Sequence, residues 1–91
     1  MELKQAFAAA LKTLRNQKHR TQEDFYLVSS RTYISTLERG LKSPTLEKID
    51  DISSVLGVHP ATLVIRSYMQ KDDVNLESIL DRIRSDLSEI G

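Results

Sequence analysis

Apolar residues recur at helical spacing along most of the chain, and polar segments separate one group from the next. The first group has apolar residues three or four positions apart: Leu3, Ala6, Phe7, Ala10, Leu11 and Leu14. This spacing predicts one apolar face on an amphipathic helix of about four turns. The polar run 16–20 ends this helix.

A second, shorter helix is predicted directly after this polar run. Thr21 suits the N-cap position, and Asp24 follows three residues later, as in a capping box. Phe25 and Val28 then face inward. Ser29 breaks the pattern and ends the helix, because serine competes for backbone hydrogen bonds.

A third helix is predicted over about residues 31–39, with Ser30 as its cap. Gly40 stands where a left-handed residue closes a helix. The buried face consists of Tyr33, Ile34 and Leu37, and the polar face consists of Arg31, Thr32, Ser35, Thr36 and Arg39. A short turn between two capped helices leaves one side of the second exposed, and the major groove of DNA admits one helix. The segment therefore predicts a helix-turn-helix.

Two further helices complete the predicted globule. Thr45 or Ser43 caps the fourth helix, and Gly57 ends it. Its inward positions are Leu46, Ile49, Ile52 and Leu56. Pro60 suits the first turn of a fifth helix, where its missing N–H costs nothing. Leu63, Val64 and Met69 form the apolar face of the fifth helix.

The last predicted helix runs from Asn75 nearly to the end of the chain, after a polar break at 71–73. Its apolar stripe consists of Leu76, Ile79, Leu80, Ile83, Leu87 and Ile90. The five preceding helices already make a core, so this stripe needs another surface. We expect a second copy of the chain to supply it; the alternative is that the helix folds back onto its own domain. The fold class is all-α, with a DNA-binding domain over 1–70 and an amphipathic helix over 71–91.

The composition hides an uneven distribution of charge. The formal net charge is zero, yet residues 1–44 hold eight Lys and Arg against four Asp and Glu, and residues 45–91 hold five against nine. One half is therefore suited to a polyanion. The absence of cysteine excludes disulfides and thiolate metal sites. No apolar run reaches membrane-spanning length and no signal peptide is evident, so we expect a cytoplasmic protein.

Several short blocks of sequence stand in an order that is typical of one family. These are Leu14-Arg15, Thr21-Gln22-Glu23-Asp24-Phe25, Tyr33-Ile34-Ser35 with Leu37-Glu38-Arg39-Gly40, Ser43-Pro44-Thr45-Leu46, and Leu56-Gly57-Val58. Over roughly residues 6–65 the chain resembles the lambda-repressor/Cro-like helix-turn-helix family, also called the XRE family. The resemblance implies a five-helix DNA-binding domain, and spaced blocks are a stronger signal than one motif.

The resemblance also implies roles for single residues. Base edges would be read by Arg31, Thr32 and Thr36, with Ser35 as a weaker candidate. Backbone phosphates would be bound by Gln22 at a helix start and by Lys42 and Ser43 in a loop. Arg15 and Glu38 would form a structural ion pair between the first and third helices. Arg39 is treated as an ordinary surface charge and is left out of both sets.

The chain departs from the family pattern at one place. Tyr26 stands where the family places a small residue, and the turn has no glycine. The interval from Gln22 to Gly40 is about two residues shorter than the usual pattern. Either the turn is tighter or the second helix is shorter, and the docking angle of the third helix depends on which of these holds.

These observations predict a homodimeric transcription regulator, a repressor that binds an inverted repeat in double-stranded DNA. The expected dimer interface is Leu76, Ile79, Leu80, Ile83 and Leu87. The alternative is a protein-interaction module, such as an antitoxin, whose last helix binds a partner protein. His19 and His59 lack further ligands at helical spacing, and no catalytic motif is present. We therefore expect no enzyme activity, metal, cofactor or small-molecule ligand.

Overall fold

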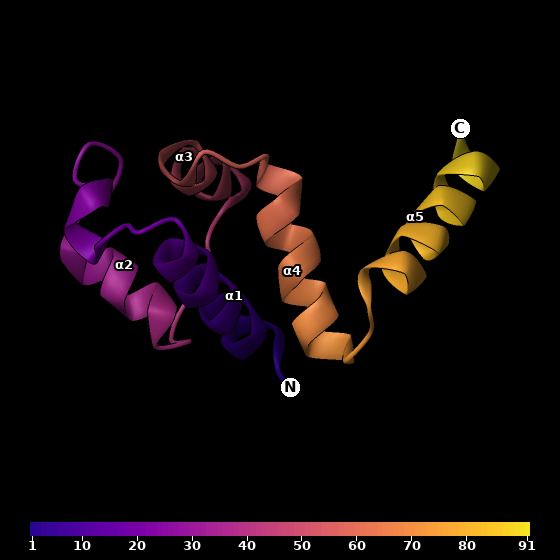
Figure 1. The fold of residues 1–91 in the computed structure, drawn as a ribbon, viewed down its shortest axis with the longest axis horizontal. Helices are drawn as coiled ribbons and strands as arrows, with labels where there is room; N and C mark the ends of the chain where they lie inside the picture. The colour runs from indigo at the N-terminus through magenta and orange to yellow at the C-terminus, as the bar shows by residue number, and fades with distance from the viewer.

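The computed structural model describes residues 1–91 as an all-helical chain without strands. The elements are α1 (Leu3–Gln17), the 3₁₀ helix η1 (Gln22–Phe25), α2 (Arg31–Glu38), α3 (Leu46–Leu56), α4 (Pro60–Asp72) and α5 (Leu76–Ile90). Figure 1 shows α1 to α4 gathered into one body and α5 projecting from it. The all-α prediction is therefore confirmed.

The core lies where α1, η1, α2, α3 and α4 meet. Its nine buried residues are Phe7, Ala10, Leu11, Phe25, Ile34, Leu37, Ile52, Leu56 and Leu63. Every one of these elements contributes at least one residue, so none can leave without opening a cavity. The apolar positions predicted from periodicity supply this core.

The predicted caps form at the helix boundaries. The Thr45 hydroxyl accepts a hydrogen bond from the backbone N–H of Lys48 at 3.1 Å, which decides between the two caps proposed for α3. Gly40 and Gly57 both have φ of +73°, in the left-handed region where a side chain is strained. Pro60 is the first residue of α4. His59 caps this helix, since its Nδ1 atom accepts a hydrogen bond from the backbone N–H of Ala61 at 3.0 Å.

The predicted second helix is wrong in type and length. A capping bond is present, from the Thr21 backbone N–H to the Asp24 carboxylate at 2.7 Å, but only one 3₁₀ turn follows. The backbone N–H groups of Val28 and Ser29 both donate to the Phe25 carbonyl at 2.9 Å. The chain therefore closes a turn around that carbonyl and does not extend a helix. The interval from Gln22 to Gly40 is therefore short because the second helix, and not the turn after it, is the shorter element.

Two further predictions need correction. Leu46 was expected to face inward, yet it is 80% exposed, because it is the first residue of α3 and no other segment of the chain lies over it. The break expected at 71–73 begins later: α4 continues through Asp72 and ends at Asp73, whose φ is +53°. Two polar residues therefore extend the exposed end of α4.

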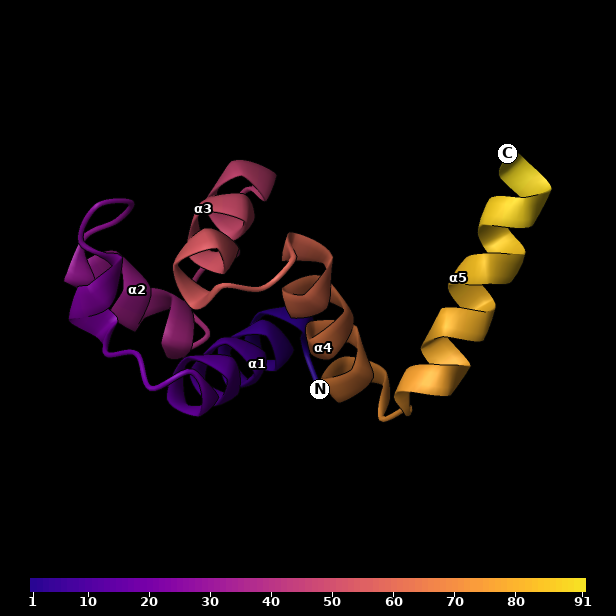
Figure 2. The ribbon, with the colours of Figure 1, turned by 45° about the horizontal axis from the view of Figure 1, so that its top comes forward.

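The last helix differs from all the others in its surroundings. None of its residues is buried, and it packs against α4. After the turn at Asp73, α5 diverges from α4, so that the two helices form a V in both views (Figures 1 and 2). Within its own domain α5 contacts mainly α4 and does not cover the rest of the globule. None of the helices combines the length and apolar character needed to cross a lipid bilayer.

Candidate nucleic-acid interface

The outward face of α2 lines a shallow hollow of about 300 Å³ that contains no apolar side chain. Its five residues are Gln22, Arg31, Thr32, Ser35 and Arg39. Four of them lie on or at the end of α2, at positions that share one helical face, and Gln22 opens η1 beside them. The hollow combines hydroxyl, amide and guanidinium groups, which are the groups that bond phosphate oxygens and base edges.

The opposite face of α2 holds the helix in place. Ile34 and Leu37 are fully buried in the core, and Tyr33 packs against it. The Ser30 hydroxyl accepts from the backbone N–H of Tyr33 at 3.0 Å and so fixes where the helix begins. The orientation of the outward face of α2 is thus set by packing on the other side, because the helix cannot rotate without exposing Ile34 and Leu37.

An ion pair between α1 and α2 adds a second constraint. The Arg15 Nε and Nη2 atoms donate to the two carboxylate oxygens of Glu38 at 2.6 and 2.9 Å. Arg15 Nη1 donates to the backbone carbonyl of Arg20 at 2.9 Å, and Gln22 Nε2 donates to Glu38 Oε1 at 3.2 Å. The Glu38 side chain is 2% exposed. One buried carboxylate therefore ties α1, the following loop and η1 to α2.

The Arg15 guanidinium of this pair has a raised pKa. The hydrogen bond that Arg15 donates to Glu38 raises the pKa of the Arg15 guanidinium above its ordinary value, desolvation by burial lowers it, and the nearby Glu38 charge adds to the rise. A group whose pKa is higher in the folded chain than in the unfolded chain stabilises the fold. This stability is complete below the pKa of the unfolded chain and is lost as the pH rises through the pKa of the folded chain. For an arginine that loss lies far above neutral pH, so the Arg15 side of the pair stays charged under ordinary conditions.

The turn between η1 and α2 is held by a contact from α3. The Lys48 ammonium donates to the backbone carbonyl of Val28 at 2.5 Å, and its Nζ atom lies 5.6 Å from the centre of the Tyr33 ring. One cation therefore contacts both the turn before α2 and the first turn of α2. This contact satisfies the Val28 carbonyl, which lies outside any helix.

Arg31 has a partner at the edge of the hollow. Its Nη1 atom lies 3.2 Å from Glu23 Oε1, and both side chains are about 70% exposed. An exposed pair of this kind contributes little to stability. Arg31 is therefore free to exchange this partner for a base edge or a phosphate.

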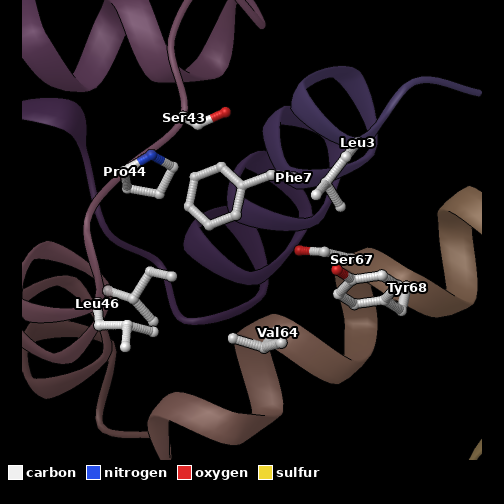
Figure 3. A pocket seen from close by; sticks show the side chains of 9 residues that line it. Leu3, Phe7, Ser43, Pro44, Leu46, Val64, Ser67 and Tyr68 are labelled. Atoms are coloured by element: carbon white, nitrogen blue, oxygen red, sulfur yellow. The ribbon is translucent and has the colours of Figure 1, made fainter.

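The remaining candidate residues lie at different places. Thr36 does not line the hollow. It is half-buried, and its hydroxyl donates to the Thr32 carbonyl at 2.8 Å. Lys42 is exposed in the loop after α2. Ser43, in the same loop, lines an apolar hollow with Phe7 and Val64 (Figure 3). The structure brings together Gln22 and most of the predicted base-reading residues, and it separates Ser43 from them.

Two residues of this site were missed from sequence. Arg39 was set aside as a surface charge, although it follows Arg31 by eight positions and Ser35 by four, a spacing that places all three on one helical face. Lys48 gave no signal, because its partners Val28 and Tyr33 lie 20 and 15 positions away. No group of three or more His, Asp or Glu residues is placed to hold a metal ion.

The expected dimer interface lies entirely on α5. Ile79, Leu80 and Ile83 are half-buried, whereas Leu76 and Leu87 are exposed. All five lie on the stripe predicted from the sequence, and in the single chain nothing covers it fully.

Comparison with known proteins agrees with this geometry. The family model described as helix-turn-helix matches residues 11–63. Two crystal structures of the clp gene regulator ClgR from Corynebacterium glutamicum are similar to this chain. One is 30% identical, with 75% of this chain and 91% of that chain covered and a TM-score of 0.68. The other is 26% identical, with 99% and 90% covered and a TM-score of 0.70. No curated protein matches the sequence.

Proposed function

Because the chain belongs to the helix-turn-helix family, it is a DNA-binding transcription regulator, and we propose that it acts as a homodimeric repressor on an inverted-repeat operator. The observation that carries this proposal is the hollow at α2, where two arginines and two hydroxyls lie on or at the end of a helix that packs against the core, and the Gln22 amide lies beside them on η1. A helix presented in this way fits the major groove.

The DNA-contacting residues divide into two groups in this proposal. Arg31, Thr32 and Ser35 face base edges, with Thr36 as a further candidate whose hydroxyl must first leave the Thr32 carbonyl. Gln22, Lys42 and Ser43 contact phosphates. Gln22 keeps a second amide hydrogen available while it donates to Glu38. We add Arg39 to the phosphate group, because it lies at the far end of the same hollow.

The dimer follows from the uncovered stripe of α5. Two copies joined through this helix would present two α2 helices about one turn of DNA apart, which matches the symmetry of an inverted repeat. Repression requires only that the dimer occupies its operator. A regulator of this kind has to share a compartment with DNA, so the cytoplasmic location belongs to the proposal.

The test is binding of labelled duplex DNA from a random pool at two salt concentrations, followed by selection of bound sites. We expect affinity to fall steeply as salt rises, because phosphate contacts release counterions, and we expect the selected sites to form an inverted repeat. Absence of binding even at low salt would remove the DNA-binding role and favour the alternative, in which α5 binds a partner protein.

Arg31→Ala refines this test. We expect it to relax base preference at one position of each half-site and to cost about 1–3 kcal/mol. Arg84→Ala is the matched control, because Arg84 is 70% exposed against 69% for Arg31 and lies on α5. An unchanged set of selected sites for Arg31→Ala would remove Arg31 from the base-reading group.

A further inference from the structure

Three apolar hollows join along α3, α4 and α5. One lies between α1, the loop before α3, and α4 (Figure 3), with a volume of about 220 Å³. The second, of about 550 Å³, lies between α3, α4 and α5, and the third, of about 430 Å³, lies between α4 and α5. Val64 lines all three. We call this continuous surface the α4 groove; its main apolar residues are Leu46, Ile49, Val64, Ile65, Tyr68 and Ile83.

Two of the three hollows are lined by residues of both α4 and α5, the helices that form a V in Figure 2. Apolar side chains line it from both sides, since Val64 and Ile65 come from α4, whereas Ile79 and Ile83 come from α5. Leu46 lies at the α3 end of the groove and is 80% exposed. An occupant of this space must therefore present an apolar face to these side chains.

The size of the chain shows how much surface is uncovered. A folded monomer of 10.4 kDa is expected to expose about 5,400 Å², whereas this chain exposes 6048 Å². The radius of gyration is 13.6 Å, against about 12.2 Å for 91 residues. The excess of roughly 650 Å² approaches the about 800 Å² that each partner buries in a standard interface.

The charges around the groove exclude a nucleic acid as its occupant. Asp50, Asp72 and Asp86 line it together with one cation, Arg82, which is paired with Asp86, so the net charge of the lining is negative and would repel phosphates. The chain itself contains a helix with an apolar stripe, α5, and no residue of this helix is buried in the single chain. An isolated helix of 15 residues is marginal in water, so α5 needs a partner surface to be stable.

We propose that α5 of a second copy fills the α4 groove and that the exchange is reciprocal, so that each globule is completed by the other chain's last helix. This inference rests on the homodimer of the proposed function and specifies its geometry. Such an interface is isologous and closes on itself. It differs from a simple seam between two α5 helices, because residues of α3 and α4 become part of the dimer contact.

The exchange also affects DNA reading. α4 packs extensively against α1, and Arg15 of α1 holds α2 through Glu38. A partner helix seated on α4 therefore contacts the same rigid body that carries the reading face. The distance between the two α2 helices is then fixed by packed elements and does not depend on the short turn at Asp73.

The test is the dimer dissociation constant of the full chain, measured by sedimentation equilibrium without DNA. Leu46→Glu places a charge in the groove at the first position of α3, where a carboxylate is favourable for the helix and the fold is retained. We expect it to raise the dissociation constant at least about tenfold, because the charge loses its water in the dimer. Leu27→Glu is the control: Leu27 is 81% exposed, lies in the turn before α2, and should leave the constant unchanged.

Tyr68→Glu is a second variant, because Tyr68 lines two of the three hollows and is 38% exposed. Unchanged dimer constants for both groove variants would overturn the exchange and leave a seam of α5 helices. A wild-type chain that stays monomeric at millimolar concentration would overturn it as well. DNA binding is measured separately at low salt, so that its loss with an intact dimer would count against the proposed function alone.

Discussion

The chain contains two helices of 15 residues, α1 and α5, with opposite surroundings. Five residues of α1 are buried, among them Ala6 and Ala10, which are fully covered. No residue of α5 is buried, although its apolar stripe is as regular as that of α1. The difference shows that periodicity reveals an apolar face but does not say which surface covers it.

The largest expected effect compares one substitution in these two helices. Leu11→Ala removes a fully buried leucine from α1, and we expect it to lower the free energy of unfolding by about 2–5 kcal/mol. Leu87→Ala removes a leucine from α5 that is 63% exposed, and we expect a change within about 0.5 kcal/mol. Urea unfolding at low protein concentration, where the chain is monomeric, measures both. Equal losses would mean that α5 is part of the core.

The second comparison concerns two arginines paired with carboxylates. Arg15→Lys loses the two-pronged contact with buried Glu38, and we expect a loss of about 2 kcal/mol in unfolding free energy. Arg82→Lys changes the exposed pair with Asp86 on α5, and we expect less than about 0.5 kcal/mol.

Both variants keep the positive charge, so the comparison isolates geometry and burial. Thermal and urea unfolding at neutral pH give the result, since arginine and lysine are both charged there. A cost for Arg15→Lys no larger than that for Arg82→Lys would show that Glu38 does not position α2 through its oxygens.

The smallest expected effect is a gain in stability. The Ser53 hydroxyl on α3 is fully buried and has no hydrogen-bond partner. Ser53→Ala should raise the free energy of unfolding by about 1 kcal/mol more than Ser85→Ala, which is on exposed α5, because both gain helix propensity but only Ser53 is desolvated. Urea unfolding measures the free energy of unfolding of both variants. A lower value for Ser53→Ala than for the unmodified chain would show that this hydroxyl makes a stabilising polar contact.

Most of the fold was predictable because its signals are local. The caps at Ser30 and Thr45, the left-handed glycines Gly40 and Gly57, and the start at Pro60 all depend on residues within one helical turn. The polar face of α2 was predictable for the same reason. Arg39 completes it at the same helical spacing.

The errors arose where distant residues decide the outcome. The second helix is a single 3₁₀ turn, because the chain has to reach α2 over a short interval while Lys48 holds the Val28 carbonyl from α3. Leu46 belongs to an apolar stripe, yet no segment of this chain covers it. Neither result can be derived from periodicity, since each depends on elements far away in the sequence.

The sequence alone therefore determined the places of the five α-helices, most of their caps and the polar face of α2, because hydrogen bonds and side-chain spacing within a few residues set them. Only the tertiary structure decided the form of the turn before α2, the outward position of Leu46 and the open V between α4 and α5. These features depend on which surfaces meet, and burial of apolar area favours any sufficiently complementary partner, whether it belongs to the same chain or to another.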